Sequence, residues 1–187
     1  MPAASMKASP LSRWAVLALA LVACSAWTQD ETVENPDYKA WSKQKVGAFA
    51  KWTVKTEGAM TTTSELTWTL KELKAEKAVI EEKTVFTSGQ VPEDVRTVTV
   101  APRIRKGTLP EGDAVEVLKE GDAELTLKGR AYKCRWVEMA FTARKGSTIK
   151  IWRCDELVGG VARVEIKHDE ASKMTLKMEL IDWKAAP

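Results

Sequence analysis

Apolar and polar side chains alternate with a period of two residues along much of the chain after residue 48. The pattern is cleanest at residues 174–180, where four apolar residues alternate with three polar ones. Such alternation is typical of a strand that buries one face. We predict strands in the stretches 48–55, 65–71, 77–87, 97–105, 115–118, 123–127, 131–141, 148–154, 161–168 and 174–180.

The turns between these stretches are short, which indicates a mainly β fold with one antiparallel sheet, because parallel strands need long crossovers. Pro102 should break its strand and place it at an edge or a bulge. Glu120-Gly121-Asp122 is read as a turn between two strands. A sheet with one apolar face must cover it. It can curl into a barrel or half-barrel, fold over a second sheet, or hold a helix in its concavity.

A short helix is predicted before the first strand. Asn35-Pro36-Asp37 combines a capping side chain, a proline at the first helical position and an acid in the first turn. Tyr38 and Trp41 would share one face of about two helical turns, and Gly47 would end the element.

The first 23 residues have the pattern of a signal peptide. Lys7 and Arg13 precede an apolar run from Trp14 to Ala23, which is too short for a membrane-spanning helix of about 20 residues. We expect export, a tether over residues 24–35 and one β domain over residues 36–187.

The run ends in Leu21-Val22-Ala23-Cys24, which resembles the lipobox of bacterial lipoproteins. The resemblance implies cleavage before Cys24 and a lipid on that cysteine, so that the membrane would be a partner. The location would then be the periplasm or the outer membrane. Ordinary cleavage after Ala26 is the alternative, and it would release a secreted protein.

Charge argues against nucleic acid as a partner. The formal net charge is +3, from 29 basic and 26 acidic residues, and two of the basic residues lie in the signal segment. The remaining 27 nearly balance the acids, whereas binding to nucleic-acid backbones relies on a positive excess.

Cys134 and Cys154 lie on consecutive predicted strands, each about ten residues from the turn between them. Such positions lie near each other in an antiparallel pair, and export would place them in an oxidising compartment. We predict a disulfide. Two separate buried thiols are the alternative, because a register slip of one residue turns the side chains to opposite faces.

No pattern points to a catalytic residue, a cofactor or a metal ion. His168 is the lone histidine and is read as a strand-end residue rather than an acid, base or ligand. Adjacent acids such as Glu81 and Glu82 would point to opposite faces of a strand. Gly159-Gly160 precedes a strand rather than a helix, so it is read as a turn or bulge.

The stretch from Ile151 to Val164, IWRCDELVGGVARV, resembles small exported bacterial proteins of the lipoprotein-carrier (LolA-like) type. The resemblance implies a half-barrel, a curved antiparallel sheet with an apolar concave side.

The function predicted from these features is non-enzymatic binding of an apolar ligand or envelope component on a concave, tryptophan-rich face. The candidate binding residues are Trp52, Trp68, Trp136 and Trp152. Met139, Met174 and Met178 would line a lipid pocket or belong to a plain core. A structural or protein-interaction domain with a filled core is a second hypothesis. A hydrolase that uses dispersed carboxylates is a third.

Overall fold

The computed structural model describes residues 31–58, 61–87, 92–169 and 173–187. The chain divides into two units, Met1–Glu31 and Thr32–Pro187. The predicted signal peptide over residues 1–23 and the predicted lipid attachment at Cys24 lie outside the described residues. No helix in the described ranges is long and apolar enough to cross a membrane.

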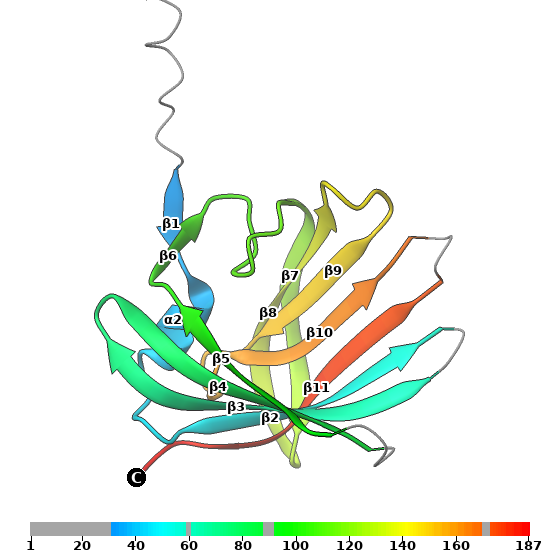
Figure 1. The fold of residues 1–187 in the computed structure, drawn as a ribbon. Coiled ribbons are helices and arrows are strands. Elements are labelled where there is room, and N and C mark those ends of the chain that lie inside the picture. Colours follow the sequence, from blue (N-terminus) through cyan, green and yellow to red (C-terminus); the bar gives the residue numbers. More distant parts are fainter. Residues whose placement is uncertain (1–30, 59–60, 88–91, 170–172) are drawn as a thin grey trace, which may run out of the picture. The chain divides into compact units, whose positions relative to one another are not determined.

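Nine strands of the unit Thr32–Pro187 form one antiparallel sheet, which confirms the predicted mainly β fold (Figure 1). Their spatial order is β5-β4-β3-β2-β11-β10-β9-β8-β7. The sheet curves, and within the described residues its edge strands β5 and β7 do not pair with each other. The bounds are Phe49–Glu57 (β2), Thr62–Lys74 (β3), Lys77–Phe86 (β4), Asp94–Val100 (β5), Val115–Leu127 (β7), Arg130–Phe141 (β8), Thr148–Arg153 (β9), Val161–Lys167 (β10) and Thr175–Lys184 (β11).

The alternation in sequence becomes a difference between the two faces of the sheet. Val164 lies opposite Met178 across β10 and β11, on the concave face. Arg163 lies opposite Glu179 on the other face and forms an ion pair with it at 2.5 Å. Burial of the apolar side chains on the concave face stabilises the fold through the hydrophobic effect. The charged side chains on the other face stay in contact with water.

The helix α2 spans Pro36–Trp41 and confirms the predicted start and type. The Asn35 side chain caps it by accepting a hydrogen bond from the backbone N–H of Asp37 at 3.0 Å. Trp41 is fully buried, and Gly159 makes room for its indole ring, because a Cβ there would come within 3.0 Å of the ring.

The tether prediction extends too far at its end. Thr32–Glu34 form the strand β1, which pairs with β6 (Arg103–Arg105) in a separate two-stranded sheet. Arg103 reinforces the pairing by donating to the carbonyl of Thr32 at 2.6 Å. A three-residue strand is too short to show a period in sequence, which explains why the prediction missed it.

The predicted turn at Glu120-Gly121-Asp122 is wrong, because β7 runs through it as one strand. Gly121 lies opposite Trp136, and a Cβ on Gly121 would come within 3.0 Å of the indole ring. The glycine therefore gives space to a neighbouring aromatic ring instead of turning the chain. Pro102 does separate β5 from β6, and β5 is an edge strand, as predicted.

The disulfide between Cys134 and Cys154 is present, with the two Cα atoms 4.3 Å apart. It lies beside the directly opposed pair Arg135 and Arg153, at the point where β9 ends. Both cysteines are buried, so the bridge fastens the β9–β10 connection to β8 from inside the core.

Candidate functional site

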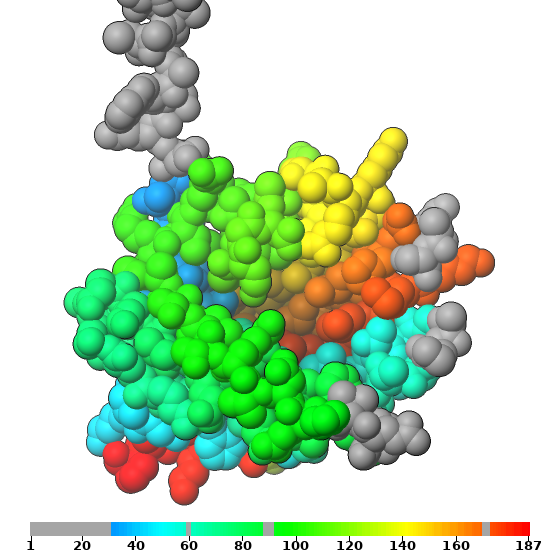
Figure 2. Space-filling model, viewed as in Figure 1, coloured from blue at the N-terminus to red at the C-terminus, as the bar shows by residue number. Residues whose placement is uncertain are grey.

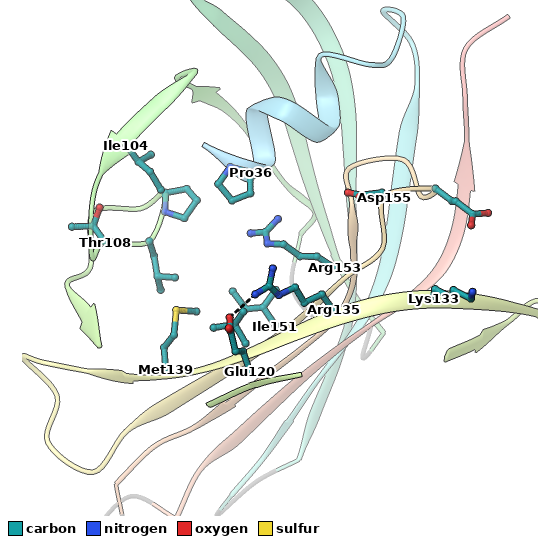
Figure 3. A pocket seen from close by; sticks show the side chains of 14 residues that line it. Pro36, Ile104, Thr108, Glu120, Lys133, Arg135, Met139, Ile151, Arg153 and Asp155 are labelled. Atoms are coloured by element: carbon teal, nitrogen blue, oxygen red, sulfur yellow. Dashed lines mark hydrogen bonds and ion pairs between the residues drawn. The ribbon is translucent and has the colours of Figure 1, made fainter. Parts of the chain in front are cut away.

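The concave side of the sheet holds two neighbouring cavities that share Leu109, Pro110, Ile151 and Arg153. The first, here called the tryptophan cavity, has a volume of about 380 Å³. The second, the arginine cavity, has a volume of about 700 Å³ (Figure 3). Both volumes fall in the range of small-molecule sites, about 300–1,000 Å³.

The tryptophan cavity is lined mainly by apolar side chains. Leu66, Val164, Ile166, Leu176 and Met178 come from β3, β10 and β11. Val164 and Ile166 are two positions apart on β10, and Leu176 and Met178 are two positions apart on β11, so each pair points to one face of the sheet. The strand register places Leu176 opposite Ile166, which brings the two pairs to the same face.

Trp52 and Trp68 line the same cavity and pack edge to face, with ring centroids 5.4 Å apart. The Trp52 Nε1–H donates to the Val161 carbonyl at 3.0 Å, and the Trp68 Nε1–H donates to the Glu82 carboxylate at 2.8 Å. Because both indole donors are satisfied by the protein, the rings add apolar surface to the cavity without an unmet hydrogen bond.

Trp136 and Trp152 lie on the other face of the sheet and line neither cavity. They are opposed to each other across β8 and β9, and the Lys150 ammonium lies over both rings, 3.8 and 4.9 Å from their centroids. The four tryptophans predicted as one surface are therefore divided, two to each face.

Leu109, in the segment between β6 and β7, is buried and lines both cavities. The atoms of this segment occupy much of the space that the ribbon leaves open between β6 and β9 (Figure 2). The segment thus forms a wall of the site that belongs to no strand of the sheet, and the periodicity of the sequence gave no sign of it.

Three ion pairs project into the tryptophan cavity. Asp37 pairs with Arg153 at 2.5 Å, and the Asp37 side chain is only 9% exposed. The other two pairs are Glu82 with Arg96 at 2.6 Å and Asp113 with Arg144 at 2.5 Å. Each charge of these three pairs is compensated at close range, so the pairs themselves stay compatible with apolar contents in the cavity.

Glu111 also lines this cavity, without an ion-pair partner among the described residues. Desolvation raises the pKa of its carboxyl, and the carboxylates of Asp37 and Asp113 raise it further, although solvent still reaches the residue.

Replacing Glu111 with glutamine should raise the free energy of unfolding near pH 7. A carboxyl whose pKa is raised by folding is destabilising in its charged form, and this penalty appears as the pH rises through and above its usual value. We expect a gain below about 1 kcal/mol, because solvent screens the group. The gain should vanish below about pH 4, where the carboxyl is protonated in both states.

Urea unfolding of the wild type and Glu111→Gln from pH 3 to 8 measures this difference. Glu116→Gln, a change of the same kind on the exposed edge strand β7, serves as the control. If the difference in free energy of unfolding between Glu111→Gln and the wild type did not change with pH, the raised pKa of Glu111 would be contradicted.

The structure also places the methionines and the histidine that the sequence analysis singled out. Met178 lines the tryptophan cavity and Met139 the arginine cavity, whereas Met174 lines neither. His168 follows β10, and its backbone N–H donates to the Met174 carbonyl at 2.9 Å. No cluster of three or more histidine, cysteine, aspartate or glutamate residues suited to a metal ion occurs in the described part of the chain.

No protein-family model and no curated protein sequence matches the chain. The solved structures that are similar to it include the following two. A LolA superfamily protein from Nitrosomonas europaea has a TM-score of 0.28 and 7% identity, and the match covers 83% of this chain and 94% of that one. A DUF1329 family protein from Desulfovibrio piger has a TM-score of 0.30 and 8% identity, with 80% and 91% covered.

The first of these belongs to the superfamily that the sequence resemblance named. With TM-scores of this size, the function has to be derived from the side chains of this chain.

Proposed function

We propose that the protein is a non-enzymatic binding protein of the cell envelope that holds an apolar ligand on the concave face of its sheet. The observation that carries the proposal is the tryptophan cavity, an apolar space of about 380 Å³ between the curved sheet and the segment around Leu109. Open apolar space of this size is unfavourable unless it is filled, because its walls lose van der Waals contacts.

The cavities favour ligand binding over a domain with a filled core. The lining side chains belong to the predicted apolar face of the strands, and they leave space between them where a filled core would interdigitate. The arginine cavity extends this space beyond Ile151, so a ligand can be longer than the tryptophan cavity alone.

The proposed location outside the cytoplasm has two supports. The first is the signal-like segment over residues 1–23 with the lipobox that ends at Cys24. The second is the disulfide between Cys134 and Cys154, which persists in oxidising compartments. We propose that Cys24 carries a lipid anchor. Residues 25–31 would then link the membrane to the folded unit that starts at Thr32.

Filling the tryptophan cavity tests the proposal. Val164→Phe adds bulk to its wall, and we expect affinity for the neutral fluorescent probe 1-N-phenylnaphthylamine to fall about tenfold or more, because overpacked apolar space resists a further occupant. Fluorescence titration of the purified protein measures the affinity.

Thr53→Phe is the matched control, since Thr53 follows Trp52 on β2 and faces the opposite side of the sheet. It should bind the probe as the wild type does. Leu176→Ala enlarges the cavity and provides a second variant if Val164→Phe does not fold. Equal probe affinity in all four proteins would contradict the proposed site.

A further inference from the structure

Two arginines face each other in the wall of the arginine cavity. Arg135 of β8 lies directly opposite Arg153 of β9, and both line the cavity (Figure 3). Like charges directly opposite on antiparallel strands destabilise a sheet. The carboxylates of Glu120 and Asp37 compensate part of this repulsion, and a bound anion would compensate it further.

The neighbouring carboxylates leave most of the guanidinium donors open. Arg135 donates through one Nη2 to Glu120 at 2.8 Å, and Arg153 donates through one Nη1 to Asp37 at 2.5 Å. A guanidinium has five N–H donors in a planar fork that fits carboxylate and phosphate oxygens. Each arginine can thus keep its protein partner and still donate to a ligand.

Lys133 extends this cationic wall. It lies two residues before Arg135 on β8, on the same face, and lines the same cavity. Among the described residues, no carboxylate lies within ion-pair distance of its ammonium group, which leaves this charge available to a ligand as well.

The rest of the arginine cavity is partly acidic and partly apolar. Glu120, Asp155 and Glu156 also line it, and of these Glu120 pairs with Arg135 and Glu156 with Arg130. Val137 and Met139 continue the same face of β8, and Ile104 and Leu109 close the opposite side. One cavity therefore has a charged part, where Lys133 and the two arginines line it together with these three carboxylates, and an apolar part. The apolar part adjoins the tryptophan cavity through Leu109 and Ile151.

We propose that the ligand is an amphiphile with an anionic headgroup, a carboxylate or phosphate joined to a hydrocarbon chain. The headgroup binds between Arg135 and Arg153, and the chain lies along Val137 and Ile151 toward the tryptophan cavity. This inference rests on the proposed function, because the chain needs the apolar space that the proposed function assigns to it.

The test compares probes that differ in their headgroups. Tetradecanoate and tetradecyltrimethylammonium carry chains of the same length and opposite charges, and inorganic phosphate carries the anion without a chain. Calorimetric titration of the full chain, below the micelle concentration, gives each affinity. We expect tetradecanoate to bind about tenfold or more tightly than the ammonium probe, because hydrogen bonds to charged groups are strong. Inorganic phosphate should bind far more weakly than tetradecanoate.

Arg135→Gln should weaken tetradecanoate binding about tenfold and leave the ammonium probe within about twofold. Its side chain is 66% exposed, so the substitution should be compatible with folding. Arg163→Gln removes the same charge from the other face of the sheet and should leave both affinities unchanged. Lys133→Gln provides a second cavity variant and should weaken tetradecanoate binding alone.

The outcomes separate this inference from the proposed function. Equal binding of the two chain probes, or equal losses in Arg135→Gln and Arg163→Gln, would overturn the headgroup assignment and leave the apolar site standing. Inorganic phosphate that binds as tightly as tetradecanoate would show a site for a free anion and overturn the amphiphile. Failure of both chain probes to bind would overturn the proposed function itself.

Discussion

Replacing Asp37 with alanine should lower the free energy of unfolding by about 3 kcal/mol. The Asp37 carboxylate is 9% exposed and pairs with Arg153, which is 26% exposed. Removing one partner of a buried ion pair leaves the other charge without compensation, which costs about 3–5 kcal/mol. We expect a loss at the lower end of this range, because solvent reaches part of the Arg153 side chain.

Asp113→Ala is the matched control, because Asp113 forms an ion pair with Arg144 at the same 2.5 Å, but with side chains 48% and 43% exposed. Exposed pairs contribute about 0–1 kcal/mol, so this variant should lose little stability. The double variant Asp37→Ala/Arg153→Met should recover much of the loss, since it removes the uncompensated charge. Urea unfolding measures all three. Equal losses of unfolding free energy in Asp37→Ala and Asp113→Ala would show that burial does not determine how much the Asp37–Arg153 ion pair contributes to stability.

Removal of the disulfide should have an effect of similar size. The bridge joins residues separated by 20 positions, and closing a loop of about this length stabilises a protein by roughly 3 kcal/mol through the restricted unfolded chain. The variant Cys134→Ala/Cys154→Ala should therefore unfold at a clearly lower urea concentration than the wild type. Alanine is the suitable replacement because both positions are buried.

The control for the disulfide is chemical. A reducing agent should shift the unfolding midpoint of the wild type toward that of the alanine variant and leave the alanine variant itself unchanged. A midpoint that does not respond to reduction would mean that the bridge contributes nothing to stability.

Most of the fold was predictable from the sequence because strand periodicity and capping are local signals. The start of α2 at Asn35-Pro36 and the long alternating stretch of β11 follow from such signals. The continuity of β7 through Gly121 was not predictable, since the reason for that glycine is the ring of Trp136 on the neighbouring strand.

The candidate site was predictable only in part, because its residues meet through strand register. Trp52 and Trp68 line the tryptophan cavity, whereas Trp152 faces away from it. The chain does carry a sign of this: Ile149 and Ile151 are in phase with each other and out of phase with Trp152.

The opposition of Arg135 and Arg153 could not be found from the sequence at all. It depends on the register between β8 and β9, and a slip of one residue would have changed every facing pair.

The most direct test of the central claim is a comparison of native and denatured mass for the protein purified without detergent from an envelope fraction. We predict a native mass larger than the denatured mass, with the excess extractable into organic solvent. The excess should be lost in Val164→Phe and kept in Thr53→Phe. Equal native and denatured masses in the wild type, together with no binding of 1-N-phenylnaphthylamine, would contradict the claim that the concave face holds an apolar ligand.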